Sequence, residues 1–327
     1  MLNLYAYDFD DTTLSTRKFH IHDMLELLVK EYDYKPFDIK LLYNSKCNDI
    51  FLKEYNRYPN NIIVLKGGSS IQKFKTDKSI KITMIIDDIH HGGTLRQCRT
   101  KSLKRINNIF CTYAYYFNNY YPKKKYKLYW LPHSIRFIDV NLNDSPINKI
   151  FVSGRLNDEI YPNRKKILDL NHKDIKYFKP NVGYRYKEND NMNNKIFGKK
   201  YIEKLSNYLC CFTCDANQKR PYIVAKHFEI LSSGSLLLAC NPYTKTYFEN
   251  LGFNDMEHYI SCDSDNMEEK IEFILNTENR NIIDNIRRKG YEFAKEKHNY
   301  FERTKFLHNI INNIELDNDY NIYKKFL

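Results

Sequence analysis

Two stretches in the second half decide the fold: Ile150–Leu168, IFVSGRLNDEIYPNRKKIL, and Pro221–Cys240, PYIVAKHFEILSSGSLLLAC. In the first, an apolar strand is followed by Gly154 and Arg155, a polar loop, and a helix that opens near Pro162. In the second, a helix passes through a short Ser-Gly-Ser turn into a buried strand. Strands that alternate with helical patterns predict parallel βαβ units with right-handed crossovers.

The same alternation extends outward to both ends of the chain. The polar segment 141–148, which contains a Pro, separates two series of alternating strands and helices, and we expect it to be a linker. Expected strands are 2–7, 39–42, 62–65, 82–86, 109–112 and 128–131 before the linker, and 149–153, 175–178, 208–213, 235–240 and 258–261 after it. Expected helices are 21–31, 95–105, 164–170, 195–207, 222–232, 267–275, 280–297 and 301–314. We predict an α/β protein with two Rossmann-like, doubly wound domains that face an interdomain cleft.

Composition narrows the class of partner. The 327 residues are 42% hydrophobic and 28% charged, which excludes wholesale disorder. Lys and Arg exceed Asp and Glu by 52 to 40, and this net charge of +12 favours anionic partners, although codon bias in an AT-rich genome also enriches Lys. No zinc-finger or helix-turn-helix signature accompanies the charge, so a nucleic-acid partner is not expected.

Targeting and cysteine signals are absent from the sequence pattern. No apolar run reaches the ~20 residues of a membrane span, and the start of the chain becomes acidic early, so we expect a cytoplasmic location; contact with a membrane surface stays open. The 8 Cys include one C-x-x-C, Cys211 to Cys214, without the second pair that zinc needs, so reduced thiols and no metal site are expected.

The loop and helix after the strand ending at Ser153 carry a phosphate-binding pattern. Gly154 permits close approach of a ligand to the backbone, and a helix N-terminus attracts anions. Arg164 and Lys165 lie in the first helical turns, where cations oppose the helix dipole unless an anion is near. The alternative is a solvated basic face.

The second stretch pairs Lys226 with Glu229 on neighbouring helical turns. Lys226 could neutralise phosphate, and the carboxylate of Glu229 could accept both hydroxyls of a ribose. Taken alone, this spacing is better explained by an ordinary i, i+3 ion pair on a helix surface.

Together, the two stretches resemble the nucleotide-sugar-binding domain of GT-B glycosyltransferases, closest to the group-1 and spore-maturation-protein-like (CgeB-type) branch. The resemblance also includes YISCDSDNMEEKIEFIL and the tail IRRKGYEFAKEKHNYFERTKFLHNII, and it covers about 149–314. It implies an N-terminal acceptor-side domain at 1–145, a nucleotide-sugar-binding domain at 146–300, and a helix in 301–327 that packs back towards the first domain.

The resemblance also implies roles for single residues. Arg155 matches a basic contact to the donor diphosphate, and Arg164 or Lys165 matches a second one. Glu229 matches the glutamate that binds the ribose, with Lys226 facing the donor. The small-residue turn beneath the nucleotide matches Ser233, Gly234 and Ser235.

One position departs from the family pattern. Family-4 retaining enzymes carry a first Glu eight residues before the ribose-binding one, and Pro221 stands there in this chain. This departure leaves open the donor sugar, hexose or pentose, and the stereochemical outcome. Asp215, in the loop after the strand that ends in TC, is a conceivable substitute.

Loops of the first domain supply the candidate catalytic residues. The strand 82–86 leads into Asp88, His90 and His91, where a His could act as a general base or hydrogen-bond donor. In GT-B enzymes a similar loop lends a His or Asp to the reaction centre; plain loop capping is the alternative. His133, in LPHS, resembles a family segment just before the linker and borders the predicted cleft.

The sequence therefore predicts a metal-independent glycosyltransferase that moves a sugar from a nucleotide-sugar donor to a glycan, glycoprotein or other acceptor, without a cofactor. One rival is a Mg²⁺-dependent, haloacid-dehalogenase-like phosphatase with Asp8 as nucleophile and Asp10 as acid/base, in DFDDT. Its later motifs are too closely spaced for the required crossover. The other rival is a non-catalytic nucleic-acid or glycan binder on a degenerate GT-B scaffold.

Overall fold

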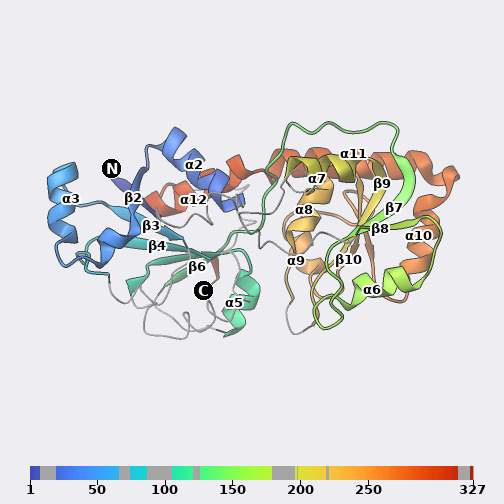
Figure 1. The fold of residues 1–327 in the computed structure, drawn as a ribbon, viewed down its shortest axis with the longest axis horizontal. Helices are drawn as coiled ribbons and strands as arrows, with labels where there is room; N and C mark the ends of the chain where they lie inside the picture. The colour runs from blue at the N-terminus through green and yellow to red at the C-terminus, as the bar shows by residue number, and fades with distance from the viewer. Residues whose placement is uncertain are drawn as a thin grey trace, which may run out of the picture. The chain divides into compact units, whose positions relative to one another are not determined.

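Parallel strands with interleaved helices form two units of the chain (Figure 1). Unit 1 comprises Met1–Pro132 and Tyr300–Leu327, and unit 2 comprises His133–Asn299. The computed structural model describes residues 1–7, 20–65, 74–86, 105–120, 126–178, 196, 198–218, 221–315 and 325–326. The polar segment 141–148, expected as a linker, lies within unit 2.

Unit 1 is built on a sheet in the order β12-β6-β5-β4-β3-β1-β2. All neighbours are parallel except β12, which pairs antiparallel with β6. The interior strand β3 reads NIIVL and is buried for most of its length, the near-continuous apolar run typical of a parallel strand covered on both faces. The strand bounds are β1 Asn3–Tyr7, β2 Lys35–Asp38, β3 Asn61–Leu65, β4 Lys81–Ile86, β5 Asn108–Cys111, β6 Lys127–Trp130 and β12 Lys325–Phe326.

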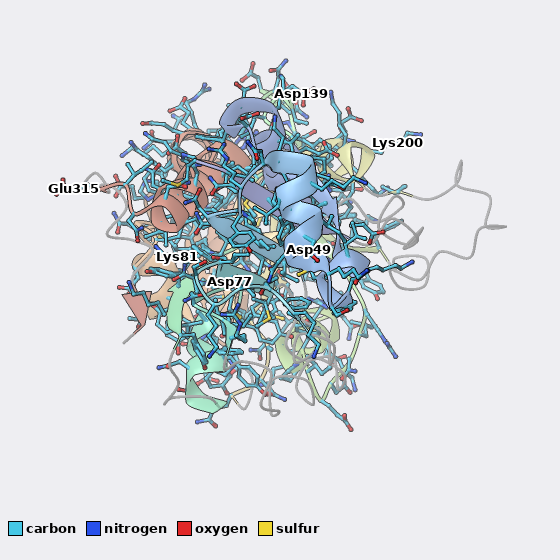
Figure 2. The ribbon with its side chains drawn as sticks, turned by 90° about the vertical axis from the view of Figure 1, so that its left-hand side faces the viewer. Asp49, Asp77, Lys81, Asp139, Lys200 and Glu315 are labelled. Atoms are coloured by element: carbon cyan, nitrogen blue, oxygen red, sulfur yellow. The ribbon has the colours of Figure 1, made fainter. Side chains whose placement is uncertain are left out.

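The helices of unit 1 include one correction to the sequence prediction. The expected strand at 39–42 is the 3-10 helix η1, Ile39–Tyr43, and the strand β2 immediately precedes it. The reason is local: the Asp38 carboxylate accepts a hydrogen bond from the Lys40 backbone N–H at 2.9 Å, which closes a turn directly after the strand. The α-helices are α2 His20–Tyr32, α3 Cys47–Tyr55, α5 Ala114–Tyr120 and α12 Tyr300–Asn312. Asp49 lies in the first turn of α3, where the helix dipole favours an anion (Figure 2).

Helix α12 is held to α2 by a ring contact and to the sheet of unit 1 by part-buried hydrogen bonds. The rings of Tyr32 and His308 lie 4.2 Å apart. The Asn312 side chain accepts a hydrogen bond from Asn3 Nδ2 at 3.0 Å and donates one to the Tyr34 hydroxyl at 3.2 Å. The final helix therefore belongs to unit 1 although it follows all of unit 2 in the sequence.

Unit 2 contains a parallel sheet in the order β11-β10-β9-β7-β8. Its core is formed by the inward residues of the strands, including the wholly buried LLLAC of β10, and by apolar residues of the helices. The strands are β7 Ile147–Ser153, β8 Ile175–Phe178, β9 Tyr208–Cys214, β10 Leu236–Cys240 and β11 Ile260–Cys262. The helices are α6 Pro162–Asp169, α7 Lys199–Ser206, α8 Ala225–Ser232, α9 Lys245–Glu249, α10 Met267–Leu275, η5 Thr277–Asn279 and α11 Arg280–Lys297.

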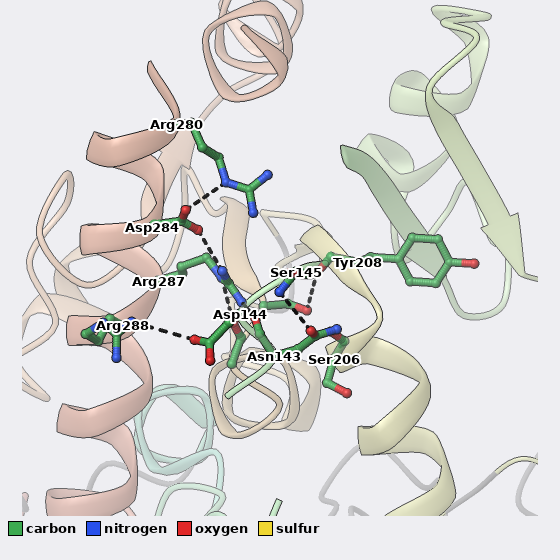
Figure 3. A network of polar contacts seen from close by, with 11 residues as sticks. Asn143, Asp144, Ser145, Ser206, Tyr208, Arg280, Asp284, Arg287 and Arg288 are labelled. Carbon is green, nitrogen blue, oxygen red and sulfur yellow. Dashed lines mark hydrogen bonds and ion pairs between the residues drawn. The ribbon is translucent and has the colours of Figure 1, made fainter. Parts of the chain in front are cut away.

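A buried arginine on α11 joins distant parts of unit 2 (Figure 3). Arg287 donates hydrogen bonds to the Gly234 carbonyl at 2.9 Å and to the Asn143 carbonyl at 2.5 Å. The Asp284 carboxylate, 2.6 Å from Arg287 Nη1, supplies the counter-charge. Asn143 also donates to the Ser206 carbonyl at 3.0 Å. These contacts fix the polar segment 141–148 to the body of unit 2.

Candidate functional site

The carboxyl ends of three neighbouring strands define one edge of the unit 2 sheet. Val152 of β7 pairs with Phe212 of β9, and Cys240 of β10 pairs with Cys214. The residues that directly follow, Gly154 and Asp215 among them, therefore lie at the same edge. Ligands of open α/β sheets bind outside these carboxyl ends.

Gly154 is the point at which two basic side chains converge. Its backbone φ is +118°, a conformation that side-chain-bearing residues rarely adopt. A Cβ placed there would lie 2.9 Å from Arg164 Nη1 and 3.3 Å from Lys226 Cε. The Gly154 carbonyl accepts a hydrogen bond from the Tyr177 hydroxyl at 3.0 Å. The glycine thus provides the space that the two cations occupy beside the strand end.

Arg164 is only 3% exposed and has unused hydrogen-bonding capacity. Its Nη1 donates to the Arg155 carbonyl at 2.8 Å, and its guanidinium lies 4.4 Å from the ring centroid of Tyr161. Its Nε is buried and has no hydrogen-bond partner within the described part of the chain. A buried donor without an acceptor is costly, so this atom points to an acceptor that a ligand would supply.

The structure separates the two residues that the sequence left as alternatives. Lys165 is exposed, and its ammonium lies 3.1 Å from the Asp158 carboxylate. Arg164, not Lys165, faces Gly154 and Lys226. Arg155 itself is exposed, with its carbonyl held by Arg164.

Lys226 and Glu229 influence each other on α8. Burial lowers the pKa of Lys226, the carboxylate of Glu229 opposes this shift, and the nearby Arg164 adds to it. Burial likewise raises the pKa of Glu229, against the attraction of Lys226 and Arg136. Arg136, from the segment after β6, was not predicted as a site residue, because no spacing within the sequence relates it to α8.

Helices α6, α7, α8 and α9 begin at this edge without acidic capping. The structure shows neither an acidic residue in the first turn nor a side-chain cap for α6, α7 or α8. Cations occupy the first turns instead. Lys165 and Lys199 are neutralised by Asp158 and Asp139. Arg164 and Lys226 instead lie against Gly154.

Asp215, the conceivable substitute for the missing Glu, is turned into the protein. It is 1% exposed and accepts a hydrogen bond from the Tyr243 backbone N–H at 2.9 Å. Burial raises the pKa of its carboxyl to about 7, because these hydrogen bonds only partly offset desolvation. Its role in the structure is to anchor the loop after β10.

Ser233, Gly234 and Ser235 are not brought together with the other predicted residues. They precede β10 and so lie at its amino end, and Ser235 Oγ donates to the carbonyls of Leu205 and Tyr208 at 2.6 and 2.8 Å. Gly234 has a φ of +76°, and a Cβ there would lie 2.6 Å from Leu142 Cδ1. The turn after α8 and packing on Leu142 explain this glycine.

Other predicted residues cannot be placed. The loop bearing Asp88, His90 and His91, the helix expected at 95–105 except its last residue, and the phosphatase motif with Asp8 and Asp10 lie outside the described residues. His133 is buried, at 8% exposure, and Pro221 is half-buried.

The described residues contain no group of three or more His, Cys, Asp or Glu side chains arranged to hold a metal ion. None of the helices in the described ranges is long and apolar enough to span a membrane. A hollow of about 250 Å³, lined by Tyr58, Asn61 and Lys81 among others, lies at the amino edge of the unit 1 sheet, away from the strand carboxyl ends.

Comparison with known proteins agrees with the fold. Residues 169–309 match the model of a family described as glycosyl transferase-like. No curated protein sequence matches the chain. Solved structures do match it: HepE from Anabaena, in complex with UDP-glucose, has a TM-score of 0.60 and 8% identity over 96% of this chain and 100% of that one. A glycosyltransferase from Rickettsia africae has a TM-score of 0.57 and 13% identity, over 96% of this chain and 98% of that one. Sucrose-phosphate synthase from Thermosynechococcus elongatus has a TM-score of 0.56 and 8% identity, over 96% of this chain and 99% of that one.

These similarities extend over nearly the whole chain and confirm the predicted fold class, two Rossmann-like α/β domains as in GT-B glycosyltransferases. At sequence identities of 8–13%, these similarities are evidence for the fold alone. The chemistry has to be argued from the residues at the carboxyl edge.

Proposed function

We propose that this protein is a glycosyltransferase of the GT-B type, which transfers a sugar from a nucleotide-sugar donor to a glycan, glycoprotein or other acceptor without a metal ion. The match of residues 169–309 to a glycosyl transferase-like family supports this activity. The cluster at the carboxyl edge of unit 2 supports the site of the donor.

One observation carries the proposal. The buried guanidinium of Arg164, with an unpartnered Nε, and the side chain of Lys226 converge on Gly154. Cations and free helix N–H groups at one strand end are suited to a diphosphate. Negative charge grows on the leaving diphosphate as the glycosidic bond breaks, and fixed cations stabilise that charge. In this proposal Arg155, Arg164 and Lys226 do so in place of a metal.

The remaining donor contacts follow from the geometry of α8. Glu229 lies one turn beyond Lys226 on α8, and its carboxylate can accept both hydroxyls of a ribose. HepE was solved with UDP-glucose, so uridine diphosphate sugars are the first donors to test, and hexosyl transfer is the first reaction. We retain Asp88, His90 and His91 of the first domain as the candidates for catalysis at the acceptor side.

Isothermal titration with UDP, GDP, ADP and UDP-glucose, in the presence of EDTA, tests the donor site. We expect at least one nucleoside diphosphate to bind. Arg164→Ala should weaken its affinity about ten-fold or more, since charge-assisted hydrogen bonds contribute about 1.5–3 kcal/mol. Glu229→Ala should weaken nucleoside diphosphate binding without weakening pyrophosphate binding. Lys165→Ala is the matched control and should leave both unchanged.

The same material separates the alternatives. Failure of every nucleotide to bind, with or without Mg²⁺, would refute the proposed function. Mg²⁺-dependent release of phosphate that is abolished by Asp8→Asn would instead identify the phosphatase. Binding of a nucleotide sugar without release of its nucleoside diphosphate would indicate the inactive scaffold.

A further inference from the structure

Two hydroxyl groups meet next to Gly154 and are not used by the proposed donor contacts. Ser153, the last residue of β7, is 4% exposed, and its Oγ lies 2.6 Å from the hydroxyl of Tyr201. Tyr201 lies in the first turn of α7, which begins at the same edge of the sheet. The hydrogen bond between them ties the start of α7 to the end of β7 and fixes the orientation of the tyrosine ring.

The ring fixed in this way lies beside Lys226. The Lys226 Nζ is 5.7 Å from the ring centroid of Tyr201, within the range of a cation–π contact. The side chain of Lys226 also lies against Gly154, since its Cε would be 3.3 Å from a Cβ at that position. The ammonium group is therefore confined between the ring and the strand end, where the proposed diphosphate would lie.

The chemistry of this contact differs from that of an ion pair. A carboxylate beside Lys226 would hold the ammonium but would also repel a phosphate. An aromatic face attracts the cation and adds no negative charge. The other charged or titratable groups near Lys226 are Glu229 on its own helix, Arg164 on α6 and Cys214 on β9. Arg164 repels the ammonium, so the ring offsets part of that repulsion.

We propose that Tyr201, oriented by Ser153, is a positioning residue that directs the Lys226 ammonium at the anion-binding position beside Gly154. This inference rests on the proposed function, because it deepens the account of the donor site. Tyr201 does not touch the phosphate and acts only through Lys226. Tyr201 can therefore contribute to anion binding only when Lys226 is present.

A double-mutant cycle with inorganic pyrophosphate tests this dependence. Tyr201→Leu should weaken pyrophosphate binding about two- to five-fold, the ratio expected from a cation–π contact. Tyr201→Phe keeps the ring and should lose less. In a Lys226→Ala background, Tyr201→Leu should have no further effect. Equal weakening in both backgrounds would show that Tyr201 is merely structural and would overturn the proposal.

A second measurement does not depend on binding. NMR titration of ¹³C-methylated lysines, with the Lys226 signal assigned from Lys226→Arg, reports the pKa of Lys226. Tyr201→Leu should lower that pKa, because the ring favours the ammonium form, and an unchanged value would overturn the proposal. If the pKa falls as expected but neither pyrophosphate nor UDP binds the unmodified chain, the contact survives and the donor site is refuted.

Discussion

Replacing Asp215 by Asn should make unit 2 more stable at high pH and should remove one source of its pH dependence. Asp215 is buried, with its pKa raised from 3.8 to about 7 mainly by desolvation. Between these two values the unfolded chain has already lost the proton that the folded protein still holds. The folded state thus loses stability as the pH rises from about 4 to 7, and the loss is constant above that.

The size of the effect follows from the shift. A difference of about 3 pKa units corresponds to about 4 kcal/mol, of which about 2.5 kcal/mol develops between pH 5 and pH 8. Asn is neutral at every pH and its carbonyl oxygen can still accept the hydrogen bond from the Tyr243 N–H. The extra N–H donor of Asn lowers the stability of the variant by the same amount at every pH, so this cost cancels when its stability at pH 5 is compared with that at pH 8. The stability of the variant relative to the unmodified chain should therefore rise by about 2.5 kcal/mol from pH 5 to pH 8.

Urea unfolding followed by hydrogen-exchange mass spectrometry on β9 and β10 peptides measures this difference in unit 2. The single Trp, Trp130, belongs to unit 1, and its fluorescence serves as an internal reference. Asp169→Asn, at an exposed position, is the matched control and should show no such trend. Parallel stability curves for Asp215→Asn and the unmodified chain between pH 5 and pH 8 would refute the assignment of a buried, proton-binding carboxyl.

Three further changes test other parts of the molecule. Gly154→Ala places a Cβ 2.9 Å from Arg164 Nη1 at a φ of +118°, so titration should show weaker UDP binding. Gly198→Ala is the control, because among the described residues its Cβ would meet only the Phe137 ring, at 3.6 Å, and UDP binding should not change. Arg287→Met removes hydrogen bonds to two backbone carbonyls and leaves Asp284 without one partner; it should destabilise unit 2 by about 3 kcal/mol in urea. Asn312→Ala breaks its hydrogen bonds with Asn3 and Tyr34 and should lower the stability of unit 1, read from tryptophan fluorescence, by about 1–2 kcal/mol.

The elements that the sequence predicted well are those whose pattern is set by burial on both faces. β3, β4 and β10 are short apolar runs because each lies inside a parallel sheet, and such runs stand out in a chain with 28% charged residues. The prediction at 39–42 was wrong because an apolar run of four residues fits a 3-10 helix as well as a strand. The Asp38 carboxylate decided between them.

At the candidate site, the residues that were predicted differ from those that were missed in how much of their signal lies in the neighbouring sequence. Arg164 was predicted from a local signal, a cation in the first turn of a helix after a strand. Lys226 was predicted from its spacing to Glu229 on one helix and from the resemblance to GT-B glycosyltransferases. Tyr201 and Arg136 were not, because they reach the site through the fold alone. Gly234 was assigned to the turn beneath the nucleotide by the resemblance to GT-B glycosyltransferases, and this stays a prediction. Its φ of +76° meets the requirement of the turn after α8.

The charges in the first turns of the unit 2 helices bear on where an anion would bind. A cation in the first turn of a helix opposes the dipole at a cost of about 0.3–1 kcal/mol, and acidic residues normally occupy that turn. Among the α-helices that the structure describes in unit 2, α10 carries the acids Glu268 and Glu269 in this turn, whereas α6, α7, α8, α9 and α11 carry none. The lack of first-turn acids therefore does not by itself mark the helices beside Gly154. What distinguishes α6 and α8 is that the side chains of Arg164 and Lys226 lie against Gly154. Arg164 is also buried, and its Nε has no hydrogen-bond partner among the described residues. An anion bound at that position would supply the missing acceptor and offset both positive charges.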